Sequence, residues 1–182
     1  MTKIRKTRNW AGIIYEDSAP ENWRSVISEM HIPMLVSPLH DRDITVDGSL
    51  KKPHWHVVLM ADGPITQEHA NELLAPLKGT KSAEYIKSLK GYVRYLAHLD
   101  DPDKATYNPD EIEAYNGADL SKLLQPTKTE SYETIGKIID FCVENSMTEF
   151  YELVESAPKN RPDDWFPLII NNAFMLSRYL TS

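Results

Sequence analysis

The chain of 182 residues contains one cysteine, Cys142, and no apolar run that approaches the roughly 18 residues of a membrane span. A single cysteine cannot form an intrachain disulfide, so a disulfide-stabilised secreted scaffold is excluded, and we expect Cys142 to be a buried thiol. The N-terminal segment MTKIRKTRNW is basic, but no apolar segment follows it, which argues against a secretory signal. We therefore predict a cytoplasmic globular protein that does not insert into membranes.

The chain also lacks an excess of positive charge, since its formal net charge is −7 at pH 7. Residues 1–100 hold 13 basic and 12 acidic side chains, whereas residues 101–182 hold 7 basic and 15 acidic ones. The acidity therefore belongs to the second part. This balance excludes a protein that coats DNA without specificity, but the first part can still present a basic surface.

Residues 1–126 have the pattern of a sheet covered by helices. Short apolar and β-branched runs followed by turn residues predict strands, and apolar positions repeated every three or four residues predict helices. The order is β-α-β-β-α-β-α, which is an α+β arrangement. The predicted strands are 9–16, 32–39, 53–61 and 83–88. The predicted helices follow Ser18 and span 66–79 and 91–99, and residues 100–111 are predicted to be a loop.

The character of the sequence changes near Gln125-Pro126-Thr127. Three helical segments are predicted beyond this point, around 132–143, 146–154 and 165–180. We accordingly predict two domains, 1–126 and 127–182, of which the second is a small all-α unit.

Two histidines, His54 and His56, lie two residues apart in the predicted strand 53–61. Side chains alternate along a strand, so both imidazoles leave the same face, about 7 Å apart. His40 ends the preceding predicted strand and Asp43 follows it, so both lie beside the pair if the two strands are neighbours. Imidazole and carboxylate ligands suit Mn²⁺, Mg²⁺, Co²⁺ or Zn²⁺. The alternative is that the two histidines are polar residues on the solvated face of a strand.

Two tyrosines lie three residues apart in the predicted helix 91–99. Tyr92 shares an arc with the apolar positions and is predicted to face the core, while Tyr95 lies on its flank with His98 within reach. A phenol with a pKa near 10 is a poor nucleophile, but a divalent cation on a phosphodiester makes the phosphorus easier to attack. The resulting phosphotyrosine ester conserves the energy of the broken bond, as a nick-and-rejoin enzyme requires. The alternative is that both tyrosines simply pack.

The combination and order of three segments, SPLHDRD (37–43), KPHWHVVL (52–59) and GYVRYLAHLD (91–100), resembles the RepB-type replication initiators of rolling-circle plasmids, which belong to the HUH endonuclease superfamily. The likeness continues through residues 101–120 and weakens in the helical tail.

By motif position, the resemblance implies that His40, Asp43, His54 and His56 are the metal ligands and that Tyr95 is the nucleophile. It implies a ferredoxin-like antiparallel sheet with helices, dependence on Mn²⁺ or Mg²⁺, and site-specific nicking of one strand at a plasmid origin. The protein would bind a double-stranded origin site and a single-stranded nick site. It would leave a 3′ hydroxyl for the host replication machinery and rejoin the ends at termination.

In that family the helical C-terminal domain assembles the protein into homo-oligomers, which are ring-shaped in some members. The candidate DNA contacts are basic residues at the N-terminal edge, just before the strand 53–61 and around the helix 91–99, although each can equally be a solvated surface charge. A mobilisation relaxase, a non-catalytic DNA-binding regulator and a structural metal domain are the competing hypotheses. The candidate DNA contacts are Arg8, Lys51, Lys52, Lys90 and Arg94.

Overall fold

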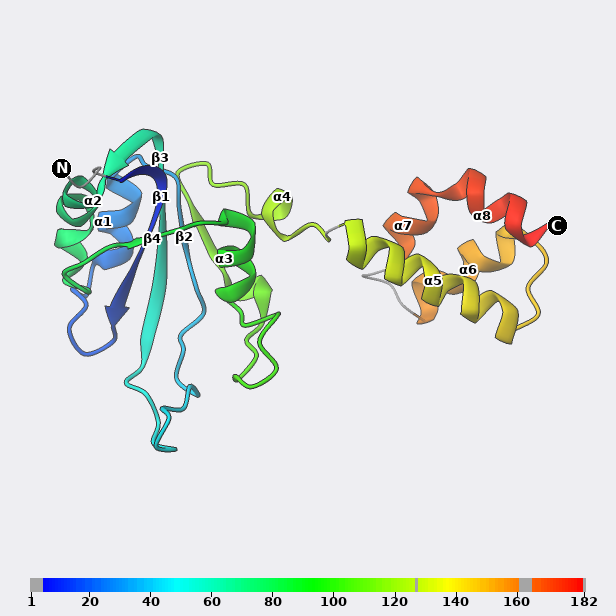
Figure 1. The fold of residues 1–182 in the computed structure, drawn as a ribbon, viewed down its shortest axis with the longest axis horizontal. Coiled ribbons are helices and arrows are strands. Elements are labelled where there is room, and N and C mark those ends of the chain that lie inside the picture. The colour runs from blue at the N-terminus through cyan, green and yellow to red at the C-terminus, as the bar shows by residue number, and fades with distance from the viewer. Residues whose placement is uncertain (1–4, 127, 161–164, 182) are drawn as a thin grey trace. The chain divides into compact units, whose positions relative to one another are not determined.

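The computed structural model describes residues 5–126, 128–160 and 165–181. Within it the chain divides into two compact units, Met1–Leu124 and Gln125–Ser182 (Figure 1). The first contains an antiparallel sheet with helices and the second is helical. The predicted α+β fold class is therefore confirmed.

The sheet of the first unit has five strands in the order β4-β1-β3-β2-β5, and every pair is antiparallel. The long central pair, β1 and β3, sets Ile13 opposite His56 and Tyr15 opposite His54. The two histidines of the predicted site therefore lie in the middle of the sheet. The strands are β1 (Lys6–Tyr15), β2 (Met34–Val36), β3 (His54–Thr66), β4 (Glu84–Tyr85) and β5 (Glu113–Tyr115).

Helices cover both faces of this sheet (Figure 1). On one face, β1 and β3 pack against α1 (Trp23–Glu29), α2 (Gln67–Leu74) and a short 3₁₀ turn, with Val57 and Leu59 in the core. On the other face, Val58 packs with α3 (Leu89–Tyr95) and α4 (Leu120–Leu124). Because side chains alternate along β3, His54 and His56 share the α3 face with Val58.

Local sequence signals explain where several elements begin and end. The Thr66 hydroxyl accepts a hydrogen bond from the His69 amide at the start of α2, and the Ser88 hydroxyl accepts one from Gly91 at the start of α3. Strand β2 is shorter than the predicted 32–39 because Pro33 and Pro38, which lack an amide hydrogen, flank it.

The segment predicted as a loop, 100–111, contains more structure than its composition suggested. A 3₁₀ turn (Pro109–Glu111) lies near its end, and β5 follows and pairs with β2 at the sheet edge. The strand was missed because its three residues, Glu113–Tyr115, include only one strong β-former and form no alternating run.

The second unit contains four helices in its described residues and has its own core. They are α5 (Lys128–Glu144), α6 (Phe150–Asn160), α7 (Phe166–Asn171) and α8 (Ala173–Leu180). Cys142 is buried in this core beside Ile138 and Leu153, as predicted. The predicted third helix is divided at Asn172, whose backbone angles are not helical and whose backbone amide and side-chain amide both donate to the Leu168 carbonyl. Across the described residues, we find no helix with the length and apolarity to span a membrane.

Candidate metal centre and nucleophile

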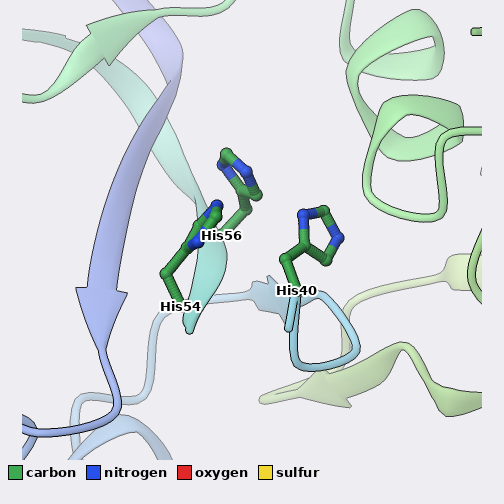
Figure 2. A group of neighbouring side chains, drawn as sticks. All are labelled: His40, His54 and His56. Atoms are coloured by element: carbon green, nitrogen blue, oxygen red, sulfur yellow. The ribbon is translucent and has the colours of Figure 1, made fainter. Parts of the chain in front are cut away.

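Three buried histidines from two neighbouring segments form the centre of the site (Figure 2). His54 and His56 extend from β3, and His40 lies in the segment after β2, where its amide donates to the His54 carbonyl at 2.8 Å. The ring centroids of His40 and His56 lie 4.9 Å apart, and those of His54 and His56 lie 5.1 Å apart. One nitrogen from each ring lies within 4.8 Å of the others. The strand register therefore produces the grouping that the sequence predicted.

Backbone carbonyls determine which nitrogen of two rings carries the proton. His40 Nε2 lies 2.9 Å from the Leu96 carbonyl, and His54 Nδ1 lies 2.8 Å from the Lys52 carbonyl. A carbonyl oxygen only accepts, so each of these nitrogens is the donor and the other nitrogen of each ring holds a lone pair. His40 Nδ1 is buried with no hydrogen-bond partner. An imidazole held by a carbonyl, with its free nitrogen facing other imidazoles, has the arrangement of a metal ligand.

The protonation state of the cluster also suits a cation. Burial lowers the pKa of His40 to about 4, and the neighbouring imidazoles contribute to this shift. Burial lowers the pKa of His56 well below its ordinary value, and His40 and His54 lower it further. Both rings are therefore neutral at pH 7, which is the form that binds a divalent cation.

Asp43 lies at the edge of this cluster and is itself almost fully buried, at 3% exposure. Its carboxylate oxygens lie 3.7 Å from His40 Nδ1 and 3.6 Å from His98 Nδ1. The Tyr107 hydroxyl donates to the same carboxylate at 3.4 Å and accepts from the Arg42 amide at 2.9 Å. His40, Asp43 and His98 form a second group whose ligand atoms lie within 4.8 Å of one another. The buried donors therefore form two groups that share His40, and the carboxylate belongs to the group with His98 rather than to the group with His54 and His56. Imidazole and carboxylate ligands of this kind suit a divalent cation.

Two further buried residues lie against the site. The sequence placed His98 within reach of Tyr95 but not among the metal ligands, and it did not indicate Tyr107. His98 has a left-handed backbone, with φ of 52°, and donates from Nδ1 to the Ala105 carbonyl at 2.8 Å, which leaves its buried Nε2 without a partner. The Tyr107 ring stacks on His40 with centroids 4.4 Å apart and planes 7° apart. Tyr107 and Ala105 lie in the segment predicted as a loop, and no periodicity there indicated buried residues.

Tyr95 is the last residue of α3, and its ring lies next to the rings of His56 and His98. Its ring centroid lies 5.3 Å from that of His56 and 5.1 Å from that of His98. The ammonium group of Lys104 lies 4.4 Å from the Tyr95 ring centroid, a contact that the sequence did not predict. Tyr95 lines two cavities, of about 460 and 370 Å³, and so faces open space next to the cluster.

Tyr92 occupies a different environment one turn earlier in α3. Its hydroxyl lies 3.4 Å from His56 Nδ1, and its ring packs partly against the core on this face of the sheet. Burial raises the pKa of Tyr92, and the charges of Glu84 and Tyr95 raise it further. A tyrosine whose ionised form is disfavoured is a poor nucleophile.

The predicted DNA contacts have varied surroundings. Lys51 and Lys52 both line the 370 Å³ cavity, and Lys52 also forms an ion pair with Asp17 at 2.7 Å. Arg94 forms an ion pair of 2.5 Å with Asp100, and its side chain is only 16% exposed. Arg8 is exposed and Lys90 is half-buried. The roles of these residues in binding DNA stay predictions.

Comparison with known proteins shows the family of the chain. Residues 2–121 match the family of plasmid replication proteins described as the origin-binding domain, and residues 128–182 match the C-terminal family of replication protein RepB. The chain belongs to the RepB-type plasmid replication initiators. The segments that carry the histidines and Tyr95 all lie inside the origin-binding match.

Two relatives resemble this RepB-type initiator over nearly its whole length. A replication protein of Staphylococcus aureus is 38% identical over 181 residues, covering 99% of this chain and 90% of the relative. Replication protein RepB of Lactiplantibacillus plantarum is 33% identical over 180 residues, covering 98% of this chain and 81% of the relative. The first domain is therefore an origin-binding domain of a plasmid replication protein.

Proposed function

We propose that this RepB-type initiator nicks one strand of its plasmid origin by attack of Tyr95 on a phosphodiester. The Tyr95 oxygen forms a bond to phosphorus while the bond from phosphorus to the 3′ oxygen breaks. The phenol proton passes to solvent, and the departing 3′ oxygen takes a proton from solvent. The products are a 5′-phosphotyrosyl link and a free 3′ hydroxyl, from which host machinery extends a new strand.

The observation that carries this proposal is a buried imidazole cluster with Tyr95 beside it at the junction of two cavities. His40, His54, His56 and Asp43 are the residues that would hold a divalent cation such as Mn²⁺ or Mg²⁺. Such a cation, when bound, supplies positive charge to the non-bridging oxygens of the phosphate and makes the phosphorus easier to attack. The buried carbonyl contacts of His40 and His54 keep their lone pairs available for this role.

Tyr95 is the better nucleophile of the two tyrosines on α3. Tyr95 lines both cavities, whereas Tyr92 lines only the larger one and its hydroxyl contacts His56. Lys104 lies over the Tyr95 ring and places a positive charge beside the path of the phosphodiester. The same ester can later be attacked by a 3′ hydroxyl, which rejoins the DNA and releases Tyr95 at termination.

The test is a nicking reaction with the full chain, Mn²⁺ and a supercoiled plasmid that carries the origin. We expect open circles with protein attached, and mass spectrometry of the digested adduct identifies Tyr95 as the modified residue. Tyr95→Phe lowers the rate by about 10³-fold or more and still binds the origin duplex. Tyr92→Phe is the matched control, because it removes the same group from the same helix, and we expect it to keep most of the activity.

Two outcomes would contradict this proposal. If Tyr92→Phe abolished the adduct while Tyr95→Phe still formed it, the nucleophile would be Tyr92 and not Tyr95. If the wild type bound the origin in a salt-sensitive way but formed no adduct with any divalent cation, the chain would be a non-catalytic regulator with this fold.

We also propose that the second unit assembles copies of the chain. Its helices expose large apolar side chains, among them Tyr132 at 70% and Phe174 at 77% exposure. Surface apolar groups of this size favour association with another protein surface. Sedimentation of the full chain tests this: Phe174→Ser shifts the equilibrium toward smaller species, and an unchanged profile for this variant would place the interface elsewhere.

A further inference from the structure

Two cavities meet at the proposed nucleophile, and their walls differ in chemistry. The cavity of about 370 Å³ is lined by His54 and by the ammonium-bearing Lys51 and Lys52. The cavity of about 460 Å³ lies between the β4 edge of the sheet and α3, and its wall includes Tyr85 and Lys87. Tyr95 and His56 line both. An extended polymer that occupies both cavities therefore passes directly over Tyr95.

Tyr85 gives the larger cavity an aromatic wall that is already fixed in position. It belongs to the edge strand β4, pairs with Trp10 of β1, and is 40% exposed. The Trp10 ring meets it edge-on, with centroids 6.3 Å apart, and the Arg5 guanidinium lies 4.3 Å from its ring centroid. An exposed ring that neighbours already orient loses little freedom when a second flat group stacks on it.

Two cations and one exposed carboxylate, Glu84, surround this wall, and this balance favours a nucleic acid over an uncharged ligand. Lys87 is exposed on the same cavity, and Arg5 adds a second cation at the Tyr85 ring. Single strands are bound by this combination, in which cations contact the backbone and aromatic rings stack on bases regardless of base identity. The cavity of about 370 Å³ has two lysines, and its second tyrosine, Tyr15, is half-buried, whereas Tyr85 is exposed; the Lys52 ammonium group lies 4.8 Å from the Tyr15 ring centroid. That cavity therefore suits phosphate more than an unstacked base.

We propose that the cavity lined by Tyr85 and Lys87 is a nucleotide subsite, in which Tyr85 stacks on one unpaired base of the strand whose backbone crosses Tyr95. This inference rests on the proposed nicking function, because it takes the single strand at Tyr95 as the occupant. It assigns a DNA-binding role to Tyr85, which lies outside the motifs that carry the metal ligands and the nucleophile.

The test measures binding in a Tyr95→Phe background, so that no cleavage takes place. The probe is a fluorescein-labelled single-stranded oligonucleotide that spans the nick region of the plasmid encoding the chain, and the readout is fluorescence anisotropy. Loss of one stacked base reduces affinity by about tenfold. We expect Tyr85→Ala to weaken binding by about this factor, and Tyr85→Phe, which keeps the ring, to bind like its parent.

A set of oligonucleotides, each with one abasic position, makes the test specific. At one position next to the nick, the abasic site weakens binding to the parent about tenfold but hardly affects binding to Tyr85→Ala, because the partner of that base is already gone. At all other positions, the two changes act independently. Tyr85→Leu, which keeps a bulky side chain on β4, must behave as Tyr85→Ala does.

Three results would overturn the inference: equal affinity of Tyr85→Ala and its parent, independent effects at every abasic position, or a loss in Tyr85→Phe as large as in Tyr85→Ala. Binding to the origin duplex and the thermal midpoint of Tyr85→Ala report whether the fold is intact. Formation of the covalent adduct by the wild type is scored separately, so failure of the nicking proposal and failure of this subsite are distinguishable.

Discussion

The buried imidazole of His40 makes the stability of the metal-free protein depend on pH. Its pKa falls from the ordinary 6.5 to about 4 because burial disfavours the charged ring. The unfolded chain therefore binds a proton that the native state excludes. The stability that the neutral His40 ring contributes is complete above about pH 6.5, and it is lost progressively as the pH falls toward about 4. Applied to these two pKa values, linkage gives a loss of about 2.5 kcal/mol between about pH 7.5 and about pH 4.5.

The measurement is urea unfolding at both pH values with a chelator present. Three of the four tryptophans, Trp10, Trp23 and Trp55, lie in the first unit, so a Trp165→Phe background makes fluorescence report that unit alone. His40→Gln removes the titrating group and provides the comparison. Its free energy of unfolding should fall by about 2.5 kcal/mol less than that of the parent over the same interval.

Equal losses in the parent and in His40→Gln would refute the reasoning, because other groups would then account for the whole pH dependence. The carboxylates and His56 are present in both proteins, so their contributions largely cancel in the comparison. Saturating Mn²⁺ at about pH 7.5 should also raise the midpoint of the parent more than that of His40→Gln, since a ligand stabilises the state that binds it.

Three further predictions concern a close backbone approach in the sheet, the carboxylate of the site and the core of the second unit. In Gly79→Ala the new methyl group would lie 2.0 Å from a backbone oxygen of β1, so we expect the free energy of unfolding in urea to fall by about 2 kcal/mol or more. Gly63→Ala, whose methyl group meets no atom within 4 Å, is the control and should lower it much less. Tyr107→Phe removes the hydroxyl that donates to Asp43, and calorimetry should show Mn²⁺ affinity about 10- to 100-fold weaker; unchanged affinity would mean that this carboxylate does not depend on the contact. Leu153→Ala opens a cavity in the core of the second unit and should cost about 2–5 kcal/mol there, seen by circular dichroism, while origin binding by monomeric protein stays intact.

Much of the fold followed from local patterns. Alternation along β3 predicted that His54 and His56 share one face while Val57 and Leu59 enter the core, and the structure has this arrangement. Cap residues predicted the start of α2, and apolar periodicity predicted the helical second unit. These features depend on neighbours a few residues apart, and so a single sequence contains enough information to predict them.

The sequence by itself determined the ligand types, their strand spacing and the tyrosine helix, because each depends on the periodicity of one element. Only the tertiary structure decided which groups complete the site. The Leu96 carbonyl that orients His40, the Tyr107 ring that stacks on it, and Lys104 above Tyr95 come from segments more than 50 residues away from His40. Such contacts arise when the sheet and the segment after α3 pack together, and no local periodicity encodes that packing.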